Sequence, residues 1–392
     1  MHLYPHARAF HSSAYTTDVF SKLSFLQKHT SQMLTDLEQI VRLESPSHHK
    51  REVEAVLERI EFWMLELGVS VKRFFSENGD HRLFTLVGKT EHRILILAHA
   101  DTVWPLGTLE RLPFRVQDGR AYGPGIYDMK AGVVQALWAL KSLEELPCTV
   151  QLLVTSDEEV GSVTSRDLIT QTAQGAKAVL VVEPSMPVSG HLKTARKGGG
   201  EFHIRIEGVA AHAGLEPEKG VNALLELSHQ ALHLTAIARP DLGTTMSVGR
   251  MTGGGPTNVV PAHAELWADL RVSTLEEAAR VQREAASLSV VNPRAKLTLT
   301  GGMERMPLER GPGTVALFEL AREVALELGF TLGEGLAGGM SDGNLTAPIA
   351  PTLDGLGAVG DGAHADHEHV VIDQMPIRAA LLAGLIERIA AS

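Results

Sequence analysis

Short apolar runs alternate along the chain with longer segments in which apolar residues recur every three or four positions. Runs at residues 94–98, 149–155 and 178–182 are typical of strands buried on both faces of a parallel sheet. Two further strand-like segments precede them, at residues 69–75 and 83–87. Helical spacing occurs at residues 31–44, 52–67, 131–146, 312–328 and 372–391. Because buried strands alternate with helices, the pattern predicts an α/β fold with a doubly wound, mostly parallel sheet.

The middle of the chain has a different pattern. Residues 201–208 alternate between apolar and polar, as in an antiparallel strand with one exposed face. Helix, two strands, helix and strand are then predicted, at residues 220–238, 245–251, 263–271, 275–289 and 296–300. This order is ferredoxin-like. We therefore predict an α+β domain at residues 194–305, inserted into a discontinuous first domain at residues 1–193 and 306–392.

Acidic and histidine side chains follow the ends of the predicted buried strands. His99 and Asp101 follow the first strand, Glu158 and Glu159 the second, and Glu183 the third. The carboxyl ends of parallel strands lie at one edge of a sheet, where binding sites gather. We therefore expect these side chains to lie close together.

Two more segments add side chains that can bind metal ions. Asp128 stands just before a predicted helix, where an N-cap is the alternative role. The segment at residues 360–369 holds three histidines and three carboxylates. Zinc binds histidine nitrogen and carboxylate oxygen, and two zinc ions can share a bridging carboxylate and a water. The set suggests a two-metal site in which Asp101 orients His99 and Glu158 acts as a general base.

Composition narrows the class of function. The net charge of −11 argues against nucleic acid or an anionic membrane as the main partner, and no apolar stretch is long enough to span a membrane. A single cysteine, Cys148, and an N-terminus unlike a secretory signal predict a cytoplasmic protein. The glycine-rich segment at residues 335–344 lacks the signature of a phosphate-binding loop. Three N-terminal histidines could bind metal, although a poorly ordered tail is the simpler interpretation: His2, His6 and His11.

Eight short motifs extend this picture. In chain order they are HADTV at residues 99–103, GPGIYDMKAG at 123–132, DEEVG at 157–161, VEP at 182–184, AHAG at 211–214, PEKGVNA at 217–223, TNVVP at 257–261 and GAH at 362–364. In content and order they resemble the aminoacylase/glutamate carboxypeptidase family of dinuclear zinc peptidases. The likeness runs from about residue 34 to residue 391, and the PEKGVNA motif is similar to the glutamate carboxypeptidase branch.

The resemblance implies a role for each metal-binding candidate. It implies two Zn²⁺ per chain, with His99 and Glu183 on one ion and Glu159 and His364 on the other. Asp128 would bridge the two ions. Asp101 would be the orienting aspartate, and Glu158 the base.

The resemblance also makes the inserted domain a lid. It implies that His212 reaches the active site of a partner in a homodimer formed through the lids and helps to polarise the scissile carbonyl. Asn258 and Arg271 match positions that bind substrate, and the fork of an arginine suits a carboxylate. The residues alone leave three other cations open for that carboxylate: Arg196, Lys197 and Arg305.

We therefore predict a zinc-dependent exopeptidase of the glutamate carboxypeptidase type, which releases a C-terminal amino acid from a small peptide or N-acyl amino acid. An N-acyl amino acid deacylase or a dipeptidase would use the same two-metal mechanism. From a different class, the chain could be a catalytically silent zinc-binding homologue. The presence of Glu158 beside a complete ligand set argues against that reading, because a silent protein needs no base.

Overall fold

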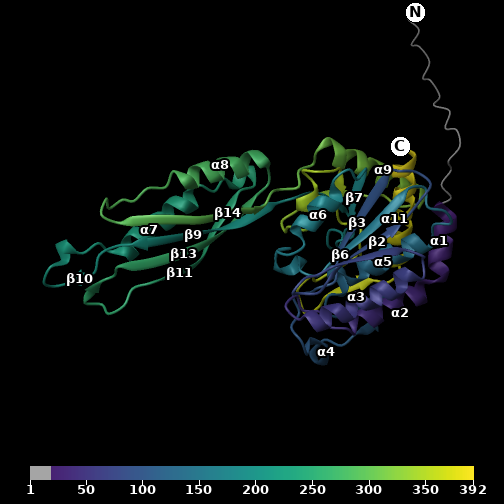
Figure 1. The fold of residues 1–392 in the computed structure, drawn as a ribbon, viewed down its shortest axis with the longest axis horizontal. Coiled ribbons are helices and arrows are strands. Elements are labelled where there is room, and N and C mark those ends of the chain that lie inside the picture. The colour runs from purple at the N-terminus through teal and green to yellow at the C-terminus, as the bar shows by residue number, and fades with distance from the viewer. Residues whose placement is uncertain (1–18) are drawn as a thin grey trace, which may run out of the picture.

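A computed structural model describes residues 19–392, and an elongated body extends from one side of a larger one (Figure 1). The three N-terminal histidines lie outside the described residues. No helix within residues 19–392 combines the length and the apolar character that crossing a bilayer would require.

Six strands form the central sheet of the larger body, in the order β1-β2-β6-β3-β7-β16. In chain order they are β1 (Ser70–Phe74), β2 (His81–Leu86), β3 (Arg93–His99), β6 (Thr149–Thr155), β7 (Ala178–Val181) and β16 (Thr352–Leu353). The four strands from β6 to β16 are parallel, whereas β2 pairs antiparallel with β6 and β1 antiparallel with β2. The prediction of a mostly parallel sheet is confirmed, with two antiparallel pairings at one edge.

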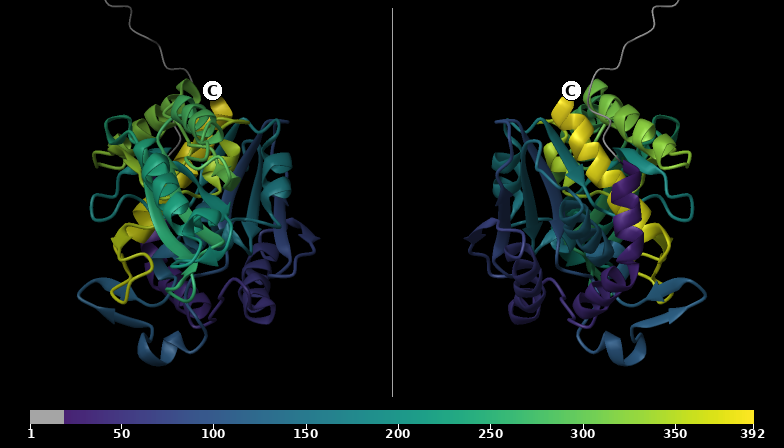
Figure 2. Two further views of the ribbon diagram at one scale, coloured as in Figure 1. Left: turned by 90° about the vertical axis from the view of Figure 1, so that its left-hand side faces the viewer. Right: turned by 90° about the vertical axis from the view of Figure 1, so that its right-hand side faces the viewer.

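Helices pack on both faces of this sheet. They are α1 (Val19–Lys28), α2 (Thr30–Val41), α3 (Lys50–Leu65), α5 (Ala131–Lys141), α6 (Arg166–Ala173), α9 (Pro312–Glu327), α10 (Gly343–Thr346) and α11 (Gln374–Ala391). The short α4 (Thr108–Arg111) lies apart from the sheet, at the edge of the larger body (Figure 1). Ile94 and Ile96 of β3 contact the core that includes α5 and α11, while Leu95 and Leu97 contact a second core that includes α6. The sheet is therefore doubly wound. Figure 2 shows the first and last helices, α1 and α11, side by side.

Two small sheets connect distant segments near the carboxyl edge of the central sheet. One has the order β17-β18-β5-β4 and is formed by β4 (Arg115–Gln117), β5 (Arg120–Tyr122), β17 (Gly360–Asp361) and β18 (His369–Val371). The other pairs β8 (Leu192–Arg196) in parallel with β15 (Glu334–Ala337). Because β18 pairs with β5, the histidine-rich segment near the C-terminus lies beside the loop that leads to Asp128.

The elongated body, here called the lid, is a four-stranded antiparallel sheet with its own core. Its strands have the order β11-β13-β9-β14, and helices α7 and α8 pack on it. The bounds are β9 (Gly198–Glu207), α7 (Ala223–Ala236), β11 (Thr245–Gly253), β13 (His263–Val272), α8 (Leu275–Ala286) and β14 (Lys296–Arg305). A short pair, β10 (Ala211–His212) with β12 (Val259–Val260), forms the tip farthest from the larger body (Figure 1). The ferredoxin-like prediction is confirmed, and the boundaries at residues 194 and 305 stay a prediction.

Candidate metal centre

Side chains from three strand ends and two loops meet at the carboxyl edge of the central sheet. β3 ends at His99, Glu158 and Glu159 lie in a single helical turn after β6, and Glu183 follows β7 by two positions. Asp128 and His364 come from loops. The predicted residues that the structure brings together are His99, Asp101, Asp128, Glu158, Glu159, Glu183 and His364.

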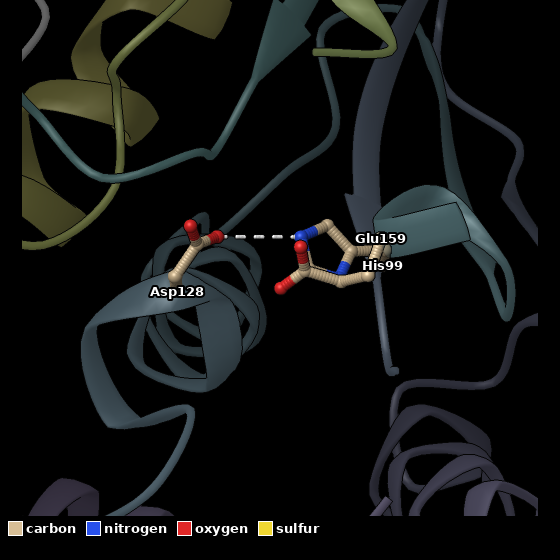
Figure 3. Close-up of side chains that lie close together, drawn as sticks. All are labelled: His99, Asp128 and Glu159. Carbon is tan, nitrogen blue, oxygen red and sulfur yellow. Dashed lines mark ion pairs between the residues drawn. The ribbon is translucent and has the colours of Figure 1, made fainter. Parts of the chain in front are cut away.

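His99 lies at the centre of this cluster and is buried. Its Nε2 atom is 3.4 Å from Oδ1 of Asp128 and 3.5 Å from Oε1 of Glu183. Figure 3 shows the ring facing Asp128, with Glu159 beside it. The other ring nitrogen, Nδ1, lies 3.0 Å from the backbone carbonyl oxygen of Asp101 and 3.5 Å from its carboxylate. These contacts turn Nε2 toward the carboxylates of the cluster.

Asp128 lies between two histidines, with one carboxylate oxygen facing each. Its Oδ2 atom is 3.4 Å from Nε2 of His364, and that nitrogen is also 3.4 Å from Oε2 of Glu159. The N-cap alternative for Asp128 is wrong, because Lys130 holds that position of α5 and the backbone of Asp128 is not helical. Hydrogen bonds that the His364 ring donates to the Asp128 and Glu159 carboxylates raise the pKa of His364 to about 10. A metal ion binds the neutral ring, so binding there would release a proton.

The cluster fits metal ions. Three of its polar atoms are buried without a hydrogen-bond partner: Nε2 of His99, Oδ1 of Asp128 and Oε1 of Glu159. Leaving such atoms unpaired is costly unless another group compensates. Two atoms that each bind a zinc ion at about 2.0–2.1 Å in tetrahedral geometry lie about 3.4 Å apart, as these pairs do. The donors are histidine nitrogen and carboxylate oxygen, and the placement of Asp128 suits a bridge between two ions.

Asp101 supports the cluster through the hydrogen bonds of its carboxylate. Its carboxylate accepts hydrogen bonds from the Ser47 hydroxyl at 2.7 Å and from the amides of Glu158 and Glu159 at 3.2 and 3.1 Å. Burial opposes ionisation of Asp101, but hydrogen bonds from His99, Ser47 and the Glu159 amide keep its pKa below the ordinary value. Asp101 therefore orients His99 and also fixes the turn that carries the two glutamates.

Glu158 is held in place by Arg305, the last residue of β14 in the lid. Its Oε1 atom accepts a hydrogen bond of 2.9 Å from Nη1 of Arg305, whose Nη2 contacts Ser162 at 2.5 Å and Asp342 at 3.2 Å. Burial and the charge of Asp342 raise the pKa of Glu158 well above its ordinary value. A buried carboxylate with a raised pKa is suited to accept and return a proton.

The cations that the sequence left open as substrate ligands have different surroundings. Arg196 pairs with Glu183 at 3.1 Å and with Asp354 at 2.8 Å, and it is buried, as is Arg305. Both guanidinium groups are thus committed to carboxylates of the protein. Lys197 is half-buried, and its ammonium group makes no hydrogen bond or ion pair within the part of the chain that the structure describes.

The sequence alone assigns no role to several residues that support the cluster. The hydroxyl of Tyr127 donates to the carbonyl of Ser185 at 2.6 Å and so connects the Asp128 loop to the Glu183 segment. Glu368 binds the same loop from the other side. Of these two residues, only Glu368 could have been singled out from the sequence, because it lies in the segment at residues 360–369 that is rich in histidines and carboxylates.

The three predicted lid residues do not join the cluster in this chain. His212 and Asn258 lie together at the far tip, where the amide of Ala213 donates to the Asn258 carbonyl at 2.9 Å (Figure 1). Arg271 lies near the other end of β13, about 26 Å along the strand from His263, and pairs with Asp269 at 2.8 Å. Within one chain, Asn258 and Arg271 therefore cannot contact the same small substrate.

The ring of His212 has a defined hydrogen-bonding state. Its Nδ1 atom accepts hydrogen bonds of 3.1 Å from the amides of Gly214 and Leu215. The neutral ring therefore carries its proton on Nε2. That tautomer can donate a hydrogen bond to a carbonyl oxygen.

The chain is similar to known proteins in both sequence and fold. A profile of "Peptidase family M20/M25/M40" matches residues 95–388. Carboxypeptidase G2 from Pseudomonas sp. (strain RS-16) is 33% identical, over 90% of this chain and 88% of that protein. A succinyl-diaminopimelate desuccinylase from Dechloromonas aromatica (strain RCB) is 28% identical, over 82% of this chain and 90% of that protein. Aminopeptidase PepT from Bacillus cereus ATCC 10987 shares the fold, with a TM-score of 0.75 and 23% identity over 92% of this chain and 99% of that one.

Proposed function

Because the chain belongs to peptidase family M20/M25/M40, and so hydrolyses peptide or amide bonds with the help of metal, we propose that it is a zinc-dependent exopeptidase that releases a C-terminal amino acid. The observation that carries the proposal is the position of Asp128 between two histidines, with Glu158 beside them. The likeness to carboxypeptidase G2 over most of both chains supports the C-terminal direction.

The residues divide into two metal-binding sets. His99 and Glu183 would hold one zinc ion, Glu159 and His364 the other, and Asp128 would bridge them. When bound, two zinc ions supply a water whose pKa is lowered toward about 7 and an electrophile that polarises the scissile carbonyl.

The remaining steps belong to residues of the protein. Glu158 takes a proton from the attacking water and passes it to the leaving amine, while Arg305 keeps its carboxylate in place. In the lid-mediated dimer proposed below, the partner subunit's His212 would donate through Nε2 to the scissile carbonyl, and the partner subunit's Asn258, beside it at the lid tip, would bind the substrate. Arg271 of the chain that holds the metal would bind the substrate carboxylate with its planar fork.

The proposed specificity is tested with matched substrates and a chelator. We expect folyl-glutamate to be hydrolysed faster than N-acetyl glutamate, N-succinyl amino acids or dipeptides, and hydrolysis to stop when a chelator removes the metal. Amidation of the C-terminal carboxylate should reduce kcat/KM sharply, because Arg271 then has no anion to bind. Equal rates on the acid and the amide would contradict the carboxypeptidase proposal.

A deacylase is the second candidate, because the similarity to the desuccinylase extends over 82% of this chain. Fastest turnover of N-succinyl or N-acetyl substrates would favour it, and a requirement for a free N-terminal amine would favour a dipeptidase. Two bound metal ions with no turnover of any substrate would instead point to a silent homologue.

We also propose that the chain forms a homodimer through its lids. Leu225 and Leu232 of α7 are 60% and 71% exposed, and their spacing puts them on one face of the helix. The strand β11 has an unpaired outer edge within residues 19–392. His212 lies far from the metal-binding cluster of its own chain, so it could act in catalysis only if a dimer brought it to the cluster of the partner.

Replacing Leu232 with aspartate is expected to give a monomer with a much lower kcat, because His212 then reaches no active site. Sedimentation velocity and kcat on the best substrate measure the two effects. Leu326→Asp is the matched control, since Leu326 is 61% exposed but lies on α9 of the larger body. A monomer with full activity would show that His212 does not act across an interface.

A further inference from the structure

Glu368 is a buried carboxylate for which the metal scheme has no use. It lies four positions after His364 and is only 3% exposed. It forms no ion pair within residues 19–392. A carboxylate in such surroundings is unfavourable unless hydrogen-bond donors compensate it.

Four donors converge on this carboxylate. Oε1 accepts from the amides of Tyr127 at 2.8 Å and Asp128 at 3.1 Å. Oε2 accepts from the amide of Gly125 at 2.9 Å and from the indole nitrogen of Trp104 at 2.8 Å. Each oxygen therefore accepts two hydrogen bonds, and the four donors fill both oxygens of the carboxylate.

The donors come from two segments that carry other candidate ligands. Trp104 follows His99 and Asp101 in the loop after β3, and the three amides belong to the loop that ends at Asp128. That loop is packed tightly against the loop after β3, because a Cβ atom at Gly125 would clash with the Thr102 side chain. Glu368 thus joins three ligand-bearing segments, including its own segment with His364.

We propose that Glu368 is a positioning residue that sets the bridging carboxylate of Asp128 and the ring of His364 in place before metal binds. The proposal rests on the proposed two-metal function and deepens it. Glu368 does not touch the metal. It holds the amide of Asp128 itself, and it fixes the short segment whose backbone at His364 has a positive φ of 62°.

The proposal predicts a specific loss of metal affinity in the variant Glu368→Gln. Glutamine keeps the size of the side chain but turns an NH₂ group toward two N–H donors, so at least two of the hydrogen bonds are lost. We expect the dissociation constant of the more weakly bound ion to rise about 10- to 100-fold, as is usual when a partner behind a metal ligand is removed. Saturating zinc should restore most of kcat.

Titration of metal-free protein with Zn²⁺ against a coloured chelator measures both dissociation constants. Hydrogen–deuterium exchange of the peptide spanning residues 123–130, without metal, measures the order of the loop directly, and it should be faster in the variant. Trp104→Phe removes one donor and should change both readouts in the same direction by less. That variant also keeps the test valid if Glu368→Gln does not fold.

The matched control is Glu226→Gln in the lid. Glu226 is 2% exposed and accepts the amides of Val291 and Asn292, both at 2.9 Å, far from the metal ligands. Unchanged zinc affinity and unchanged exchange in Glu368→Gln would overturn the proposal, as would an equal loss of affinity in the control. If the wild-type protein bound no zinc, the proposed function would be overturned instead. In that case, slower exchange of residues 123–130 in the wild type than in Glu368→Gln would still support the positioning role.

Discussion

Replacing Glu158 with glutamine is expected to lower kcat by about 10²–10⁴-fold while the zinc content of the protein stays unchanged. Glutamine has the size of glutamate and can still accept the hydrogen bond from Arg305, so the cluster keeps its shape. It cannot take the proton from the attacking water or return it to the amine. Steady-state kinetics and metal analysis on the same preparation measure the two quantities.

The neighbouring glutamate provides the control for this prediction. Glu159→Gln alters the same turn, but Glu159 faces His364 at 3.4 Å, so this variant should lose zinc as well as activity. The two variants should therefore differ in metal content and agree in activity. Loss of zinc from Glu158→Gln would make Glu158 a ligand, and full activity would remove its role as the base.

Replacing Asp128 with alanine is expected to remove both metal ions and reduce activity to background. Each oxygen of Asp128 faces a different histidine, so one substitution removes a ligand from both metal sites. Zinc at 100 times its dissociation constant stabilises a folded protein by about 2.7 kcal/mol, and this gain should disappear in the variant. Thermal unfolding with and without zinc, together with zinc per chain, measures the effect.

A carboxylate from the same histidine-rich region serves as the control for Asp128. Asp366 pairs with Arg111, its side chain is 68% exposed, and it lies outside the cluster. Asp366→Ala should retain the zinc-induced rise in Tm and the activity. If Asp128→Ala still bound two zinc ions per chain, Asp128 would not be the bridge.

The sequence predicts the core strands and their ends well, because those features are local. Every residue from Ile94 to Leu97 is apolar, so the run reads as a strand buried on both faces, and His99 marks its end. Helix α1 is not predicted from the sequence, because it is short, only 10 residues, and is held by packing against α11. The brief strands β17 and β18 have no periodicity to detect, since each is only two or three residues long.

The sequence indicates which residues can bind metal, but it does not indicate which side chains contact one another around them. Tyr127 and Glu368 are 241 positions apart, and Glu158 and Arg305 are 147 apart, so no local pattern connects them. The same limit applies to the lid. The motifs place His212, Asn258 and Arg271 in one domain, but only the length of β13 shows that Arg271 lies at the opposite end from the other two.

The way the chain enters and leaves the lid has a consequence for how such a protein can evolve. The first and last strands of the lid, β9 and β14, are neighbours, with Gly199 opposite Arg305, so the two crossing points are about 4.8 Å apart. A segment with adjacent ends can be lengthened, trimmed or exchanged without opening the gap it fills in the host. Such an exchange would leave the metal-binding candidates of the larger body in place, provided that Arg305, the last residue of β14, is kept to pair with Glu158.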